Sequence, residues 1–167
     1  MRISVSSDMD EPVARALVTR LRERGHEVVP HGALRPGDDP QWAACSEAAA
    51  RDVAEGRSEQ AVVCCWTGTG ASIAANKVPG VRAALCTDAY TADGARRWND
   101  ANVLALGLRL TSEPLLTEIL DAWFAAAPSQ DAEDRENVAH VGRLDSGRTV
   151  EPRGQDGRAV RDRTVGS

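Results

Sequence analysis

The sequence has no long hydrophobic run, and this absence limits where the protein can work. The amino-terminal segment Met1–Asp8 holds too short an apolar stretch for a secretory signal peptide. No later stretch is long enough to span a bilayer as a helix. We therefore expect a cytoplasmic protein without a membrane partner.

Positive charge is also scarce. The 167 residues include 20 Lys and Arg against 25 Asp and Glu, a formal net charge of -5 at pH 7. The arginines are not gathered in one basic stripe with interleaved aromatic residues, so the sequence argues against a nucleic-acid partner. A mildly acidic chain disfavours a polyanion, but it can still bind a small phosphate at one local site.

Cysteine is limited to four residues, and none of them belongs to a Cys-x-x-Cys pair. Without that spacing or a secreted context, we expect neither disulfides nor a metal site. His26 and His31 have no partner at metal-ligand spacing and are predicted to be surface or edge residues. Cys64 and Cys65 are neighbours in one expected strand, where successive side chains point to opposite faces. We predict that Cys65, which abuts the following turn, faces a site and that Cys64 packs in the core.

The apolar pattern predicts one α/β domain. It indicates strands over residues 2–6, 26–30, 60–65, 81–86 and 102–107, and helices over residues 13–24, 41–56, 91–99, 112–127 and 131–144. Strands that alternate with helices imply a parallel sheet with right-handed crossovers. We expect the domain to cover residues 1–144. Residues 145–167 are rich in Gly, Arg and Asp without apolar periodicity, which predicts a disordered tail.

The most informative stretch is Gln60–Lys77, in which an apolar strand leads directly into a Gly/Thr-rich turn and a small-residue helix. The carboxyl end of such a buried parallel strand, here Cys65, is where open α/β sheets place ligands. Gly68 and Gly70 allow successive backbone N–H groups to point into one concavity, beside a helix expected to begin near Ala71. This pattern predicts an anion site, although a Gly-x-Gly turn serves packing alone in many α/β proteins.

A cysteine directly before such a turn suggests chemistry. A thiol beside a helix N-terminus can ionise more readily, and neighbouring amide donors can hold a developing oxyanion. This combination suits proton abstraction next to a carbonyl, with backbone amides holding the resulting enediolate. Residue type alone also leaves open a buried, inert cysteine at position 65.

Three segments, Thr67–Gly70, Ser72–Cys86 and Asn99–Leu104, resemble the ribose-5-phosphate isomerase B family, which also includes the subunits of galactose-6-phosphate isomerase. The resemblance covers residues 1–127 and continues weakly to about residue 145. It implies a Rossmann-like, three-layer αβα sandwich with a five-stranded parallel sheet. It also implies cofactor-free aldose–ketose isomerisation of a phosphorylated sugar by a homodimer, often a tetramer, whose active sites are shared between subunits.

The resemblance suggests roles position by position. Cys65 matches the catalytic base, Thr67 matches a hydroxyl residue of the same loop, and Asn99 matches an asparagine that reaches the sugar from the partner subunit. Substrate contacts are expected from Asp8, Met9, Trp66, Gly68, Thr69, Gly70, Trp98 and Asn99. Phosphate contacts are expected from Arg109, Arg143 and His140.

Several positions depart from the family pattern. Met9 stands where the family has the histidine of an Asp-His pair, Trp98 stands where it has a helix histidine, and Trp66 replaces a glycine. Ala139 replaces the first arginine of a carboxyl-terminal Arg-His-x-x-Arg pattern. In the family those histidines handle the sugar ring and the phosphate, so the ring-opening step does not carry over. The two tryptophans either pack as structural residues or fill the volume that a longer sugar would occupy.

We therefore expect an isomerase of a short or obligately open-chain phosphosugar, such as a tetrose phosphate, with Cys65 as the base. Two alternatives stay open: a family member that binds a phosphorylated metabolite without turnover, and an enzyme with altered chemistry in a specialised pathway. Retention of Cys65, Thr67 and Asn99 favours chemistry, whereas loss of the histidines favours the non-catalytic alternative.

Overall fold

The computed structural model describes residues 1–147. The strands are β1 (Arg2–Ser7), β2 (Glu27–Gly32), β3 (Gln60–Cys65), β4 (Ala83–Leu85) and β5 (Val103–Gly107). The helices are α1 (Pro12–Glu23), α2 (Trp42–Ala54), α3 (Thr69–Ala75), α4 (Ala89–Asn99), α5 (Glu113–Ala125) and α6 (Ala132–Asp145). The strands form one sheet in the order β2-β1-β3-β5-β4, and every pair is parallel. The predicted α/β class and five-stranded parallel sheet are confirmed.

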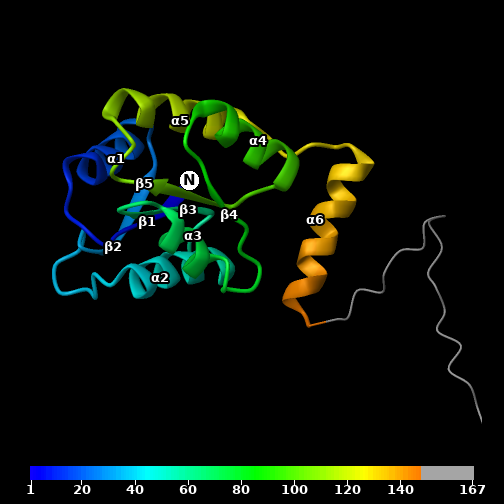
Figure 1. Cartoon of the computed structure of the whole chain (residues 1–167), viewed down its shortest axis with the longest axis horizontal. Coiled ribbons are helices and arrows are strands. Elements are labelled where there is room, and N and C mark those ends of the chain that lie inside the picture. The colour runs from blue at the N-terminus through cyan, green and yellow to red at the C-terminus, as the bar shows by residue number, and fades with distance from the viewer. Residues whose placement is uncertain (148–167) are drawn as a thin grey trace, which may run out of the picture.

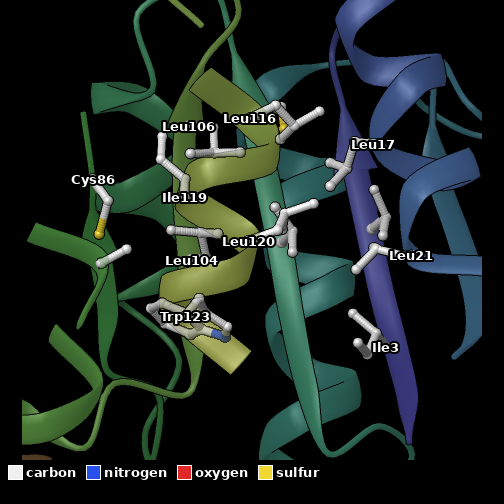
Figure 2. Packing of buried hydrophobic residues seen from close by; sticks show 14 of the residues in the cluster. Ile3, Leu17, Leu21, Cys86, Leu104, Leu106, Leu116, Ile119, Leu120 and Trp123 are labelled. Carbon is white, nitrogen blue, oxygen red and sulfur yellow. The ribbon is translucent and has the colours of Figure 1, made fainter. Parts of the chain in front are cut away.

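Helices cover both faces of the sheet and make three layers (Figure 1). One face packs against α1, α4 and α5, around large apolar side chains such as Leu104, Leu120 and Trp123 (Figure 2). The other face packs against α2 and α3, where small residues such as Ala49 and Ala71 are fully buried. This arrangement is the predicted Rossmann-like sandwich.

Helix α5 shows how local sequence places a helix on the sheet. Ser112 caps it, because its Oγ accepts a hydrogen bond from the Leu115 N–H at 3.3 Å. Leu116 and Trp123 recur at helical spacing and are buried against the sheet. The Trp123 indole Nε1 donates a hydrogen bond to Gln60 Oε1 at 2.7 Å, which fixes α5 to the start of β3.

The strand order reverses between β1 and β3. From β1 the chain passes through α1 to β2 on one side, whereas β3 lies on the other side of β1. Open α/β sheets have a crevice outside the carboxyl ends of the strands at such a reversal, and ligands bind there. Because β1 ends at Ser7 and β3 ends at Cys65, the loops that follow these two residues border the crevice.

His31 lies on the edge strand β2, but its side chain is buried rather than at the surface. Its Nε2 is 2.7 Å from Asp52 Oδ2, and Ser4 Oγ donates to the same oxygen at 2.6 Å. Arg57 Nε donates to Asp52 Oδ1 at 2.7 Å. Helix α2 thus covers the edge strand and completes a polar network that the sequence of β2 alone did not indicate.

Helix α6 stands apart from the three layers and has no buried residue (Figure 1). Its carboxyl end is attached to the body by Asp145, whose Oδ2 accepts a hydrogen bond from the Gly80 N–H at 2.8 Å. The helix includes Asp145, and residues 148–167 of the predicted tail lie outside the described residues. Within residues 1–147, no helix combines the length and apolar character needed to cross a membrane.

Candidate active site

Two of the predicted site segments meet at the carboxyl edge of the sheet. β3 ends at Cys65, and Ser7 at the end of β1 pairs with Cys64. The residues that follow this pair are Asp8, directly after β1, and Cys65, the last residue of β3, so the two backbones continue next to each other at the strand reversal. Parallel pairing therefore brings together residues that are more than fifty positions apart in the sequence.

The loop after β5 runs alongside the loop after β3. The Arg109 N–H donates to the Trp66 carbonyl at 3.0 Å, and the Leu108 N–H donates to the Cys65 carbonyl at 3.0 Å. The Arg109 side chain is exposed, and it forms no ion pair with any of residues 1–147. The backbone of Arg109 thus lies against the Cys65 loop, and its guanidinium has no carboxylate partner in this part of the chain.

The turn after Cys65 requires glycine at position 68. Gly68 has φ +76°, and a Cβ there would lie 2.5 Å from Leu85 Cδ1 and 2.8 Å from Gly107 N. Both the left-handed backbone and the close approach of β5 exclude a side chain. Gly68 is the N-cap of α3, so the helix begins at Thr69, two residues before the position expected near Ala71.

The two cysteines face opposite sides of the sheet, as predicted. Cys64 packs in the apolar cluster beneath α1 and α5, and burial raises the pKa of its thiol. Cys65 belongs to the other cluster, beside α3. Its Sγ accepts a hydrogen bond from the Ala71 N–H at 3.4 Å. The thiol at the strand end is thus the one in contact with the glycine turn.

The turn presents several hydrogen-bond donors directly after Cys65. The hydroxyl oxygens of Thr67 and Thr69 are 2.7 Å apart, and both side chains are exposed. Thr69 and Gly70 occupy the first two positions of α3, where a helix supplies no backbone acceptor for the N–H groups. Because one hydroxyl donates to the other, one hydroxyl and two amides remain as donors in the turn after Cys65.

Trp42 is a residue of this region that the sequence analysis did not single out. It opens α2, and a Cβ on Gly70 would lie 3.0 Å from its ring atom Cε3. The sequence did carry one signal for Trp42. It lies at the start of a helix that follows a parallel strand, and such helix starts lie at the carboxyl edge of the sheet. Trp42, Trp66 and Trp98 are 45%, 46% and 42% exposed, so none of them is a core residue.

The loop after β1 contributes a carboxyl group in an unusual environment. Ser7 Oγ donates to the Met9 carbonyl at 2.7 Å and fixes this loop, while the Met9 side chain is partly exposed. Asp8 Oδ1 is buried and has no hydrogen-bond partner among residues 1–147. Burial raises the pKa of the Asp8 carboxyl, and a hydrogen bond from its own backbone opposes this effect.

Trp98 and Asn99 are not brought to Cys65 within one chain. They end α4, and β5 begins after them at Val103, so their backbone lies at the amino edge of the sheet. The five residues of β5 separate the two edges by about 13 Å at 3.3 Å per residue. The predicted site is therefore divided into two halves in a single chain.

The remaining predicted phosphate ligands, His140 and Arg143, lie on α6. Arg143 Nη2 is 3.4 Å from His140 Nδ1. A groove of about 370 Å³ between α6 and the body is lined by residues that include Trp98, Asn99 and Val138. Asn99 and α6 thus border the same groove, in the same half of the predicted site.

Residues 1–147 include no group of three or more His, Cys, Asp or Glu side chains placed to hold a metal ion. Fold and site together define an α/β protein with a strand-end thiol beside a glycine turn that opens a helix. The chain belongs to the ribose/galactose isomerase family, whose model matches residues 3–141.

Individual relatives agree with this membership. The chain is 41% identical over 112 residues to ribose-5-phosphate isomerase B of Escherichia coli, covering 66% of this chain and 73% of that protein. It is 37% identical over 106 residues to D-erythrulose-4-phosphate isomerase of Pectobacterium atrosepticum, covering 64% and 70%. The solved structure of Clostridium thermocellum ribose-5-phosphate isomerase B matches with a TM-score of 0.80 and 35% identity, over 88% of this chain and 99% of that one. The predicted family and isomerase class are confirmed.

Proposed function

We propose that this protein interconverts the aldose and ketose forms of a short or open-chain phosphorylated sugar, such as a tetrose phosphate. The observation that carries the proposal is the position of the Cys65 thiol, which accepts the Ala71 amide directly beside the glycine turn. A base and an oxyanion site at one strand end are the two elements that proton transfer between adjacent carbons requires.

In the proposed reaction, the Cys65 thiolate removes a proton from the carbon next to the carbonyl. The bonding electrons move to the carbonyl oxygen, and the amides of the turn with the Thr67 hydroxyl stabilise the enediolate. The proton then returns to the neighbouring carbon, so no cofactor is needed. General-base catalysis contributes about 10²- to 10⁴-fold to such a step.

Arg109 is the proposed phosphate ligand of this half of the site. Its exposed guanidinium follows the Leu108 and Arg109 amides that bind the Cys65–Trp66 backbone, so it lies next to the catalytic loop. An arginine fork matches two phosphate oxygens, and each hydrogen bond between charged groups contributes about 1.5 to 3 kcal/mol. His140 and Arg143 of the partner subunit are proposed to complete the phosphate site.

Three side chains favour a substrate that needs no ring opening. Met9 and Trp98 replace histidines of the family pattern, and neither can exchange a proton with a ring oxygen near neutral pH. A tetrose 4-phosphate cannot close a furanose, because its 4-hydroxyl is esterified. Trp66, the residue directly after Cys65, adds a large, half-exposed side chain to this loop, and we propose that it leaves less room for a longer sugar. The 37% identity to a D-erythrulose-4-phosphate isomerase supports the same choice.

A second copy of the chain is proposed to complete the site. One chain cannot bring Asn99 to its own Cys65, because the two residues lie at opposite edges of the sheet. Helix α6 has no buried residue and exposes Val141 and Leu144, so it offers apolar surface to a partner. A homodimer, or a tetramer of two dimers, would place Asn99 of the partner subunit against the glycine turn.

The test compares kcat/KM on D-erythrose 4-phosphate, D-erythrulose 4-phosphate and ribose 5-phosphate. We expect kcat/KM to be at least about tenfold higher for a four-carbon substrate, because one additional carbon unit in a pocket typically changes kcat/KM by this order. Trp98→His should raise the activity on ribose 5-phosphate. Arg97→His, which adds an imidazole at the neighbouring position on α4, is the matched control and should not.

Two outcomes would contradict the proposal in different ways. Efficient turnover of ribose 5-phosphate by the unmodified protein would overturn the assignment to short substrates. Calorimetric binding of these phosphates without turnover of any of them would replace the isomerase with the non-catalytic alternative, which the loss of the two histidines favours.

A further inference from the structure

We propose that Asp8 is a further catalytic residue, whose carboxyl group passes a proton between the two oxygens of the enediolate that Cys65 generates. The inference rests on the proposed isomerase function. It supplies what that function leaves unassigned, namely a group that protonates one substrate oxygen and deprotonates the other.

The position of Asp8 carries the first part of the argument. It follows the last residue of β1, and the pairing of Ser7 with Cys64 places it level with Cys65 on the adjacent strand. These two strands flank the reversal of the strand order, where a bound ligand lies between them. Asp8 and Cys65 can therefore contact adjacent atoms of one small substrate.

The environment of the carboxyl group carries the second part. A buried carboxylate oxygen without a hydrogen bond costs free energy, and Asp8 Oδ1 is such an atom within residues 1–147. Burial and, to a smaller extent, the charge of Asp8 raise the pKa of the neighbouring thiols of Cys45 and Cys64. No ion pair with Asp8 is formed in the described part of the chain. A substrate hydroxyl between the strands would give this oxygen the partner that it lacks.

The buried position also favours the acid form that the step needs. Burial raises the pKa of Asp8, so a larger fraction of the group is neutral than in an exposed aspartate. The other side chains of this half of the site are poor alternatives. Met9 has no exchangeable proton, and Thr67 has an alcohol that ionises far above neutral pH. Asp8 is thus the carboxyl group at the end of the strand that pairs with the Cys65 strand.

The proton balance of the step is closed. Cys65 takes the carbon proton and forms the enediolate, and Asp8 then gives its own proton to the enediolate oxygen, which yields a neutral enediol and an Asp8 carboxylate. The carboxylate then removes the proton of the neighbouring hydroxyl as the new carbonyl forms, and the Cys65 thiol returns the carbon proton to the other carbon. Asp8 ends protonated and Cys65 ends as the thiolate, as both began.

The test measures turnover and hydrogen exchange together in deuterated water. With Asp8→Asn we expect kcat to fall about 10²-fold or more, with a much smaller change in KM. Because Cys65 can still remove the carbon proton, deuterium entering recovered substrate should rise relative to product formed. Asp10→Asn is the matched control: Asp10 lies on the same loop, is exposed and pairs with Arg15 at 2.7 Å, so both readouts should stay unchanged.

Other results would overturn the role of Asp8. A raised KM with an unchanged kcat would make it a binding residue only, and an equal loss of exchange and turnover would place it before carbon deprotonation. If circular dichroism shows that Asp8→Asn does not fold, Asp8→Glu replaces it in the test. The longer side chain moves the carboxyl group, so kcat should fall and the ratio of deuterium in recovered substrate to product formed should rise. An unchanged ratio would refute the role. If the unmodified protein exchanges no hydrogen into any phosphosugar, as is expected of Cys65→Ser, the isomerase function is refuted, and the role of Asp8 with it.

Discussion

The adjacent thiols Cys64 and Cys65 are both buried but lie on opposite faces of the sheet, because successive side chains of β3 alternate between the faces. Cys64 is enclosed by apolar side chains beneath α1 and α5, where burial raises the pKa of its thiol and makes it inert. Cys65 contacts the Ala71 amide at the carboxyl end of the strand. A difference of one position therefore separates a packing residue from the proposed base.

Serine substitutions should distinguish the roles of the two cysteines. Cys65→Ser is expected to lower kcat by about 10²- to 10⁴-fold, because the alcohol is a poor base, while substrate binding persists. Cys64→Ser should keep most of the activity and lower the free energy of unfolding by about 1 to 3 kcal/mol, because it buries a hydroxyl among apolar groups. Isomerisation assays and urea unfolding of both variants measure these effects. Inactivity of Cys64→Ser alone would reverse the assignment.

At the scale of elements, the turn between β3 and α3 depends on one glycine. Gly68→Ala should destabilise the protein, since a left-handed conformation costs an L-residue roughly 1 to 2 kcal/mol and the new Cβ would also meet Gly107 N at 2.8 Å. Because the turn must shift, we expect activity to fall as well. Gly37→Ala is the control: Gly37 has φ +85° and nothing lies within 4 Å of an added Cβ, so only the backbone cost applies. Equal losses of stability in the two variants would show that the contact with β5 has no effect.

Local patterns predicted the elements well where the residues themselves determine the structure. β3 has the predicted bounds, Gln60–Cys65, because a continuous apolar run specifies a buried strand. The strand predicted over residues 81–86 is shorter, Ala83–Leu85, because the Arg82 N–H binds the Asn102 side chain instead of a neighbouring strand. Contacts of this kind depend on tertiary structure and leave no periodic signal.

The candidate site was predictable in part for the same reason. The strand end and glycine turn are contiguous in sequence, so the positions of Cys65 and Gly68 followed from their neighbours. The packing of Trp42 over Gly70 and the buried contact of His31 with Asp52 both come from the placement of α2 on the sheet. No local pattern encodes that placement.

At the scale of the whole molecule, the free energy of unfolding should depend on pH through the protonation of Asp52. Burial alone would raise the pKa of this carboxyl, but hydrogen bonds from Ser4, Arg57 and His31 outweigh it and hold the pKa below its usual value. Because the pKa of Asp52 is lower in the folded state, its ionised form stabilises the protein at pH values above the unfolded-state pKa of about 3.9. This stabilisation is lost as the pH falls through the folded-state pKa.

We therefore expect the free energy of unfolding in urea to decline as the pH falls below about 5, with part of the decline caused by Asp52. Asp52→Asn should be less stable at neutral pH and should show a flatter dependence between pH 5 and the acid limit. Glu118→Gln, at an exposed position of α5, should keep the original slope. A slope that Asp52→Asn leaves unchanged would exclude this carboxyl as a source.

The divided site predicts a subunit-mixing experiment. Cys65→Ser and Asn99→Ala should each be nearly inactive, because each damages a different half of the proposed shared site. In mixed dimers one of the two sites contains both defects and the other contains none, so random exchange should restore about a quarter of the original activity. Light scattering should show a dimer or tetramer throughout. A monomer that turns over substrate, or mixtures as inactive as Cys65→Ser alone, would contradict the shared site.

Helix α2 gives a practical route for changing the space beside the glycine turn of the proposed site. Its 13 residues form a rod about 20 Å long, with Trp42 against Gly70 at one end and Asp52 held by the edge-strand network near the other. Replacing the indole of Trp42 with a smaller group should therefore increase the volume beside the turn without disturbing the hydrogen bonds of Asp52. Libraries of substitutions at Trp42 and Trp66 would test whether these two side chains limit the length of the sugar in the proposed reaction.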